Sequence, residues 1–283
     1  NSDRRKLVQV LRAATTPSRT VIMTIVDKSW ARPGSILDLF LESFRTGDGT
    51  KFYLKHLVIV ALDSQAFQYS KDIHPHCYHL KTAAHFKPFT SFSYLILNKR
   101  RNELLLEVVE LGYSVVYTDA DVMWLRNPLP HFQIPRELSI ACDSSLSDAS
   151  SEGESTDGGF GGFFHLMSSD VTVEFFHLWK LVGVLYPRVA NLSLCEISRD
   201  TKFVQSAGFR IKFVEADYYG EFCRPSRNIS KTYTMHANCC NNLESKVHDL
   251  KLVLHALANP EKSKDGTLHQ LFTSGNTLKC LTR

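Results

Sequence analysis

The sequence predicts an α/β fold in which a mostly parallel sheet is covered by helices. Short apolar runs typical of buried strands occur at residues 21–26, 57–62, 115–118 and 138–142. Stretches with apolar residues at helical spacing separate the first two runs and precede the third. Strands that alternate with helices in this way pair in parallel, and the helices pack on the faces of the sheet.

The remaining elements can be justified in chain order. Residues 3–13 are expected to form a helix within an N-terminal helical segment, 1–20, and residues 34–44 a second helix between the first two strands. Residues 77–80 are expected to be a short strand, and residues 92–111 to contain a long helix that Gly112 ends. We expect all 283 residues to form a single domain, because that length and 43% hydrophobic residues can bury a large core.

Residues 144–162 differ in composition from the rest of the chain. They are rich in serine, acidic residues and glycine, which predicts a flexible loop within the domain. The glycines have two interpretations: they permit the backbone to approach a ligand closely, or they belong to a surface excursion with no ligand.

Two carboxylates, Asp119 and Asp121, follow the third apolar run and are separated only by Ala120. The carboxyl ends of strands in an open α/β sheet form the ligand crevice, and carboxylates there can hold a divalent cation against a diphosphate. The alternative is that these residues only form a turn or cap a helix. The helix, glycine and strand that precede them favour the crevice, so the sequence predicts metal-assisted chemistry on a nucleotide.

Two blocks of sequence carry a family resemblance. The first spans residues 100–128 and contains Gly112-Tyr113, Thr118-Asp119-Ala120-Asp121 and Trp124-Leu125-Arg126-Asn127-Pro128. The second contains Tyr219-Gly220-Glu221-Phe222-Cys223, Thr234-Met235-His236-Ala237-Asn238-Cys239-Cys240 and Lys246-Val247-His248-Asp249-Leu250. Together the blocks resemble the plant nucleotide-diphospho-sugar transferases, glycosyltransferase family 77, and the similarity extends from about residue 21 to residue 254.

The resemblance implies a GT-A-type, Rossmann-like fold with a smaller acceptor-side subregion. It also implies a manganese-dependent glycosyltransferase that moves arabinose, xylose or galactose from a UDP-sugar to a cell-wall glycan or glycoprotein with retention of configuration. In such an enzyme Asp121 would ligate manganese directly, and Asp119 would face the ribose or a metal-bound water. His236 would be the third protein ligand, since imidazole suits manganese.

Further residues would bind the nucleotide. Thr24, Val26 and Asp27, at the end of the first strand, would lie at the uracil and ribose edge. Arg100, Arg101 and Lys246 are candidates for diphosphate contacts, although a solvated helix face is the alternative for each and is favoured for all but one of them. Ala120 would contribute backbone between the two aspartates.

Two departures from the family pattern leave alternatives open. The Asn-Gly-Gly-Phe expected near residue 163 is changed, and the Asp-Gln pair expected after Tyr186-Pro187 is missing, with Glu196 or Asp200 as possible replacements. One alternative is therefore a catalytically impaired relative that binds nucleotide or glycan. The other is a haloacid-dehalogenase-type phosphatase, which also places Asp-x-Asp after a strand but near the start of its domain.

Charge and cysteine content indicate the compartment and partners. A net charge of +4 and a pI near 8.6, without a basic stripe, argue against nucleic-acid binding. The chain begins at Asn1 and shows no apolar leader, which suggests a processed or truncated portion of a longer protein. The family resemblance implies a Golgi-lumenal protein with a type II membrane anchor upstream. The sequons at Asn191 and Asn228 and the seven cysteines agree with that lumen. The odd number leaves at least one cysteine unpaired unless it bonds to another chain. Because Cys239 and Cys240 cannot easily bond to each other, we expect at least one of them to reach another segment, with Cys223 as a plausible partner.

Overall fold

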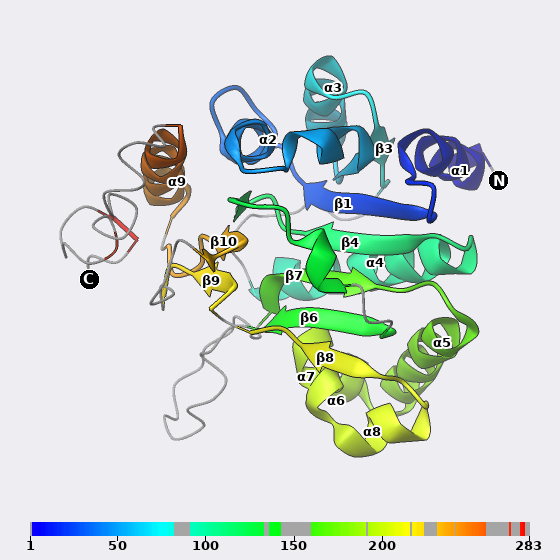
Figure 1. The fold of residues 1–283 in the computed structure, drawn as a ribbon. Helices are drawn as coiled ribbons and strands as arrows, with labels where there is room; N and C mark the ends of the chain where they lie inside the picture. Colours follow the sequence, from blue (N-terminus) through cyan, green and yellow to red (C-terminus); the bar gives the residue numbers. More distant parts are fainter. Residues whose placement is uncertain are drawn as a thin grey trace.

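The computed structural model describes residues 2–81, 91–132, 136–142, 160–190, 192–215, 217–223, 231–240, 242–258, 272 and 278–280. Its main sheet has the order β3-β2-β1-β4-β7-β6-β8 (Figure 1). The strands are β1 (Thr20–Val26), β2 (Leu57–Ala61), β3 (Cys77–His79), β4 (Ser114–Thr118), β6 (Leu138–Cys142), β7 (Phe160–Leu166) and β8 (Ile211–Phe213). The strands β3, β2, β1 and β4 pair in parallel, whereas β7 runs antiparallel to both of its neighbours. The predicted α/β class with a mostly parallel sheet is confirmed.

A second, three-stranded sheet lies beside the carboxyl end of β4. It has the order β5-β10-β9, formed by β5 (Val122–Trp124), β10 (Thr234–His236) and β9 (Tyr219–Glu221). In the register of these strands His236 is opposite Val122 on one side and Glu221 on the other. This small sheet therefore brings the second sequence block next to the end of the first.

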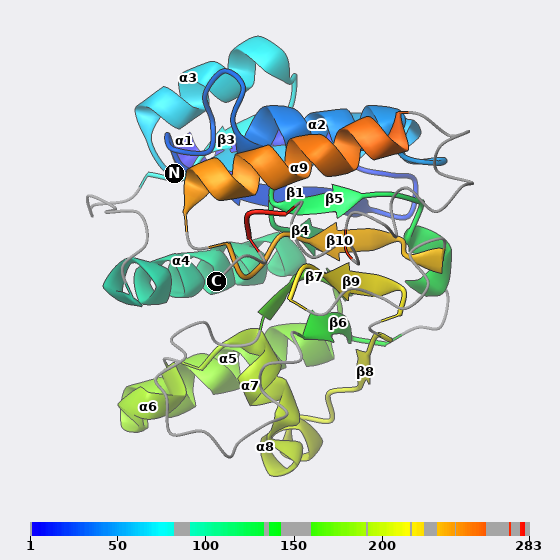
Figure 2. The ribbon, with the colours of Figure 1, turned by 90° about the vertical axis from the view of Figure 1, so that its left-hand side faces the viewer.

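Helices cover both faces of the main sheet because successive strand side chains point to opposite faces. One face carries Ile22 and Val116 and packs against α2 (Ile36–Thr46), α3 (Ser64–Ile73) and α9 (Leu243–Leu257). The other carries Val21 and Val115 and packs against α1 (Ser2–Ala14), α4 (Ser91–Glu110), α5 (Asp170–Leu185) and α7 (Leu194–Arg199). Short helices η1 (Lys51–His56), η2 (Leu129–Phe132), α6 (Pro187–Ala190) and α8 (Thr201–Ser206) complete the described elements. Figure 2 shows α9 alongside α2.

The C-terminal boundary predicted for the loop at residues 144–162 is wrong. Most of the predicted loop lies outside the described residues, but residues 160–162 belong to β7. The start of β7 is hydrogen-bonded to the turn after β4, because the N–H of Asp119 donates to the carbonyl of Gly162 at 2.7 Å. Glycine content suggested a loop, but here the glycines continue a strand because the strand must pass close to the Asp119 turn.

Three disulfides form, Cys142–Cys195, Cys223–Cys239 and Cys240–Cys280, and Cys77 is a buried free thiol. The prediction that at least one of Cys239 and Cys240 bonds to another segment, with Cys223 as a partner, is confirmed, and both of them do so. Both sequon asparagines, Asn191 and Asn228, lie outside the described residues. Among the helices that the structure describes, none is long and apolar enough to cross a membrane.

The fold contains a buried histidine whose titration should make stability depend on pH. His74 is 6% exposed and its Nε2 lies 2.8 Å from the carbonyl oxygen of Leu57. Burial lowers the pKa of His74 below its ordinary value of about 6.5. The unfolded chain therefore binds more protons just below that pH, and we expect the free energy of unfolding to fall as the pH decreases through about 6.5. Urea melts at several pH values should show a smaller decrease for His74→Gln, and an equal decrease would contradict this assignment.

Candidate active site

Asp119 and Asp121 lie in a tight turn between the main and small sheets. Strand β4 ends at Thr118 and β5 begins at Val122, whose N–H donates to the carbonyl of Asp119 at 3.1 Å. The carbonyl of Asp121 accepts the N–H of Ala237 at 3.0 Å, which attaches this turn to the end of β10. Because a strand and not a helix follows Asp121, the helix-cap interpretation of the pair is wrong. The turn fixes the direction of both carboxylates.

Three side chains in this turn and on β10 could hold a metal ion. Asp119, Asp121 and His236 each offer one ligand atom, and these atoms lie within 4.8 Å of one another. His236 Nε2 is 3.6 Å from Asp121 Oδ1, a buried oxygen with no hydrogen-bond partner in the structure. A buried carboxylate oxygen without such a partner is costly unless something else satisfies it. Two carboxylates and an imidazole are a suitable donor set for manganese, so the residues fit the metal that the sequence implied.

Neighbouring groups set the charge of the two aspartates. Burial alone would raise the pKa of Asp121, but the charges of Lys246 and His236 hold the pKa well below its usual range. Burial, followed by the charge of Asp121, raises the pKa of Asp119. The hydroxyl of Tyr117 donates to Asp119 Oδ1 at 2.8 Å and fixes that carboxylate. Asp121 is therefore the carboxylate that remains ionised most readily.

Lys246 reaches this cluster from the first turn of α9. Its Nζ donates to Asp121 Oδ2 at 2.5 Å and lies 5.3 Å from the ring centre of Trp30. The helix begins at this point because the side chain of Asn242 caps it by accepting the N–H of Ser245 at 2.8 Å. The structure thus places a buried ammonium group next to the candidate metal ligands.

Gly162 is the closest part of β7 to the cluster. Its φ of +67° is in the left-handed region, and a Cβ there would be 2.8 Å from Val122 Cγ2 and 3.3 Å from both Asp119 Oδ2 and His236 Cδ2. At Gly162 the backbone approaches three side chains closely, whereas close approach of the glycines to a ligand stays a prediction. The backbone leaves space that the Asp119 and His236 side chains need.

We expect Gly162→Ala to displace the side chains of Asp119 and His236. The left-handed backbone disfavours alanine, and the added methyl group would press on two candidate ligands. Metal affinity, measured by calorimetry with manganese, should fall about 10-fold or more, as for other disturbed metal surroundings. The matched control is Gly208→Ala, which has a φ of +63° but no atom within 4 Å of the added Cβ. Equal metal binding by both variants would contradict this prediction.

Comparisons with known proteins agree with this geometry. Residues 53–250 match the family described as nucleotide-diphospho-sugar transferase. The chain belongs to this family. It is 33% identical to an uncharacterized Arabidopsis thaliana protein, At4g15970, over 99% of this chain and 74% of the relative. It is also 42% identical to the A. thaliana UDP-D-xylose:L-fucose alpha-1,3-D-xylosyltransferase 3, over 16% of this chain and 12% of the relative.

The fold is also that of known glycosyltransferases. A glycosyltransferase involved in the glycosylation of the major capsid of PBCV-1 superposes with a TM-score of 0.50 at 9% identity, covering 82% of this chain and 98% of that one. The predicted GT-A type is confirmed. The family match favours a transferase over the phosphatase alternative.

The residues predicted to bind the nucleotide differ in how they relate to the cluster of Asp119, Asp121 and His236. Thr24 and Val26 lie at the end of β1 and Asp27 directly follows it. Because β1 pairs with β4, all three lie at the same edge of the sheet as Asp119. Thr24 Oγ1 is buried without a hydrogen-bond partner. Asp27 Oδ1 accepts the N–H groups of Ser29 and Trp30, and so shapes the loop that carries Trp30 toward Lys246. The side chain of Val26 belongs to the core.

The two arginines differ. Arg100 pairs with Glu103 at 2.7 Å and donates to the carbonyl of Lys81, away from the cluster. Arg101 is 4% exposed, with its guanidinium carbon 5.3 Å from the ring centre of Tyr117. The positive charge of Arg101 lowers the pKa of Asp119, but burial raises that pKa by more.

The possible replacements for the missing acidic pair are helix caps. Glu196 Oε2 accepts the N–H of Ser193 at 2.6 Å in a capping box at the start of α7. Asp200 Oδ1 accepts the N–H of Phe203 at 3.0 Å at the start of α8. The sequence contained this signal, since Ser193 stands three residues before Glu196. Tyr117, Trp30 and Gly162 were not predicted as site residues. Trp30 and Gly162 contribute through contacts with residues distant in sequence, whereas Tyr117 contacts Asp119 two residues away.

Proposed function

We propose that the chain is a metal-dependent glycosyltransferase that moves arabinose, xylose or galactose from a UDP-sugar to a cell-wall glycan or glycoprotein, with retention of configuration. The observation that carries the proposal is the cluster of Asp119, Asp121 and His236 with Lys246 beside it. Negative ligands and a positive side chain at one sheet edge suit a nucleoside diphosphate held through a cation. The short similarity to a UDP-D-xylose-dependent transferase supports a pentose donor.

The residues would divide the work as follows. Asp121 and His236 would hold a divalent cation, which when bound supplies positive charge to the departing diphosphate. Lys246 would share its ammonium group between Asp121 and a diphosphate oxygen. Asp119, oriented by Tyr117, would accept a hydrogen bond from the ribose. Because these groups are fixed before the donor arrives, they would stabilise the developing charge without reorganising.

Retention is supported by the roles of two described carboxylates outside the metal cluster. Glu196 and Asp200 are the two carboxylates considered as replacements for the acidic pair. Both accept backbone N–H groups as part of helix caps. An inverting enzyme needs a general base to deprotonate the acceptor hydroxyl. In a front-face transfer the leaving diphosphate oxygen takes this proton, so positioning of the diphosphate supplies most of the catalysis.

The test is binding followed by turnover. Calorimetry should show UDP affinity falling sharply when manganese is chelated, and a panel of UDP-sugars with manganese should release UDP for one of the pentose or hexose donors. An NMR analysis of the product anomer then decides between retention and inversion. Equal UDP binding with and without metal would exclude the proposed site.

The second candidate is a relative that binds nucleotide or glycan without transfer. The capping roles of Glu196 and Asp200 favour it, because no carboxylate replaces the missing Asp-Gln pair there. Metal-dependent UDP binding without UDP release from any donor or acceptor would support this candidate. We also propose residence in the Golgi lumen behind an upstream anchor, since the three disulfides suit an oxidising compartment.

A further inference from the structure

The segment that joins His236 to Lys246 is unusual in its backbone and its crosslinks. It leaves β10 after His236 and enters α9 at Leu243, so one short connection carries a candidate metal ligand at its start and the ammonium group just after its end. Cys239 within it has a φ of +63°, a left-handed conformation that is unfavourable for a residue with a side chain. Such conformations persist only where the surroundings fix them.

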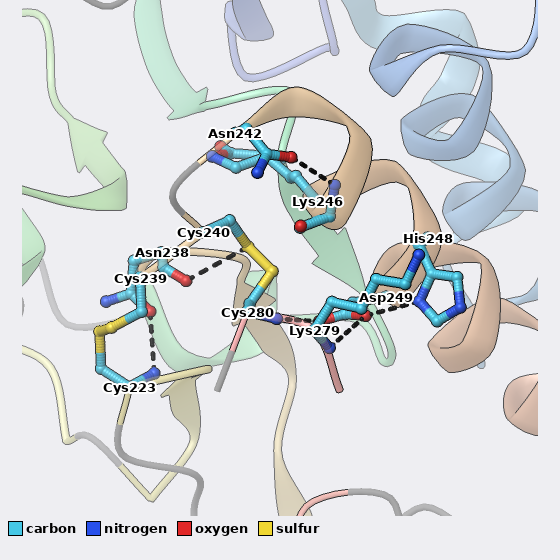
Figure 3. Close-up of a disulfide and its surroundings, with 12 residues drawn as sticks. Cys223, Asn238, Cys239, Cys240, Asn242, Lys246, His248, Asp249, Lys279 and Cys280 are labelled. Carbon is cyan, nitrogen blue, oxygen red and sulfur yellow. Dashed lines mark hydrogen bonds and ion pairs between the residues drawn. A yellow bond between two sulfur atoms is a disulfide. The ribbon is translucent and has the colours of Figure 1, made fainter. Parts of the chain in front are cut away.

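Two disulfides fix this connection from opposite sides (Figure 3). Cys239 is bonded to Cys223, just after β9, and the adjacent Cys240 is bonded to Cys280 near the end of the chain. Asn238 adds two hydrogen bonds toward the same end of β9: its Oδ1 accepts the N–H of Cys223 at 3.1 Å, and its Nδ2 donates to Glu221 Oε2 at 2.6 Å. The residues that follow His236 are thus attached to β9 both covalently and by hydrogen bonds.

The second crosslink leads back to α9 through a buried carboxylate. Asp249 is fully buried on α9, where its Oδ1 accepts the N–H of Lys279 at 2.9 Å and its Oδ2 accepts the N–H of Cys280 at 2.8 Å (Figure 3). His248 Nδ1 lies 2.8 Å from Asp249 Oδ1. Since Asp249 follows Lys246 by about one helical turn, Cys240, Cys280, Asp249 and α9 form a closed loop of bonds.

We propose that Cys223–Cys239, Cys240–Cys280 and Asp249 are positioning groups that hold His236 and Lys246 at the distances from Asp121 that the donor requires. This inference rests on the proposed function. The argument is geometric: His236 and Lys246 act on different oxygens of Asp121, at 3.6 Å and 2.5 Å, from two different elements. The connection between those elements is the covalent link that sets their separation, in addition to the pairing of β10 with β5 and the packing of α9 on α2. Small misplacements of such groups reduce binding and catalysis strongly.

The third disulfide provides a matched control. Cys142–Cys195 joins β6 to α7, and neither element carries Asp119, Asp121, His236 or Lys246. It separates residues by 53 positions, compared with 16 and 40 for the other two. Chain entropy predicts that removing the longest crosslink destabilises the fold at least as much as removing either of the others. Stability and positioning can therefore be separated.

The experiment compares three double variants with the native protein: Cys223→Ser with Cys239→Ser, Cys240→Ser with Cys280→Ser, and Cys142→Ser with Cys195→Ser. Asp249→Asn is measured in parallel because it leaves every crosslink intact. Calorimetry gives UDP affinity with manganese, thermal melting gives stability, and hydrogen exchange reports the order of residues 234–250. We expect the first two pairs and Asp249→Asn to weaken UDP binding about 10-fold or more and to speed exchange in that segment, in the range found for groups that orient metal ligands.

The control pair should lower the melting temperature yet leave UDP affinity unchanged. Equal UDP affinity in all variants, or equal losses in the site pairs and the control pair, would overturn the proposal. If the native protein binds no UDP with manganese, the proposed function fails instead. Hydrogen exchange in residues 234–250 then still shows whether these groups order His236 and Lys246, and unchanged exchange in the variants would overturn the positioning role as well.

Discussion

Replacing Asp121 with Asn is expected to remove manganese-dependent UDP binding. The amide preserves the size of the side chain and can still accept the hydrogen bond of Lys246, but it loses the negative charge that faces His236. Loss of one charged ligand from such a site costs several kcal/mol, so UDP affinity with manganese should fall about 100-fold or more. Calorimetry with and without manganese measures this directly, and transfer activity should fall in parallel.

A matched control exists for this change. Asp200→Asn makes the same substitution at an exposed helix cap, where asparagine caps equally well. It should leave UDP affinity and transfer unchanged. Native UDP affinity in Asp121→Asn would exclude Asp121 as a metal ligand.

Asparagine is the informative replacement because alanine would remove both the metal ligand and the hydrogen-bond partner of Lys246. Asp121→Ala would leave the ammonium group of Lys246, 9% exposed, without its partner. An unpaired buried charge costs about 3–5 kcal/mol of stability. Loss of binding in the alanine variant would therefore mix a missing ligand with a weakened fold.

The fold was predictable from local patterns to a large degree. The apolar runs at 21–26, 57–62, 115–118 and 138–142 became β1, β2, β4 and β6 because buried parallel strands are apolar on both faces. The small sheet was harder to predict. Its strands β5, β9 and β10 span three residues each, too short for a periodic pattern, and they pair only because β4 and the second block meet in space.

For the site, too, features that are local in sequence could be predicted, whereas features that depend on contacts between distant segments could not. Asp119 and Asp121 could be recognised because a strand and a doublet of carboxylates are contiguous in sequence. Tyr117 lies within the predicted strand 115–118, and its sequence position alone does not indicate that its hydroxyl donates to Asp119. Gly162 could not be distinguished from the other glycines near it, since only its contact with Asp119 and His236 gives it a role. Trp124, just after the pair in sequence, is fully buried and stacks on Phe44.

Replacing Lys246 with Met should separate metal binding from diphosphate binding. Methionine retains the length of the side chain beside Trp30 but removes the ammonium group from Asp121 Oδ2. A hydrogen bond to a charged group contributes about 1.5–3 kcal/mol, so UDP affinity with manganese should fall about 10- to 100-fold. Affinity for manganese alone should be kept or increase, because Asp121 no longer shares its charge with a lysine. Calorimetry with manganese alone and then with UDP measures both.

The contrast between the two variants is the decisive observation. Asp121→Asn should lose manganese and UDP together, whereas Lys246→Met should lose only UDP. Lys251→Met, an exposed lysine on the same helix, is the matched control and should change neither. In Lys246→Met the carboxylate of Asp121 is left buried without its cation, so added manganese should raise the melting temperature more than in the native protein. A loss of manganese binding in Lys246→Met would contradict the assignment of Lys246 to the diphosphate and place it among the groups that organise the metal ligands.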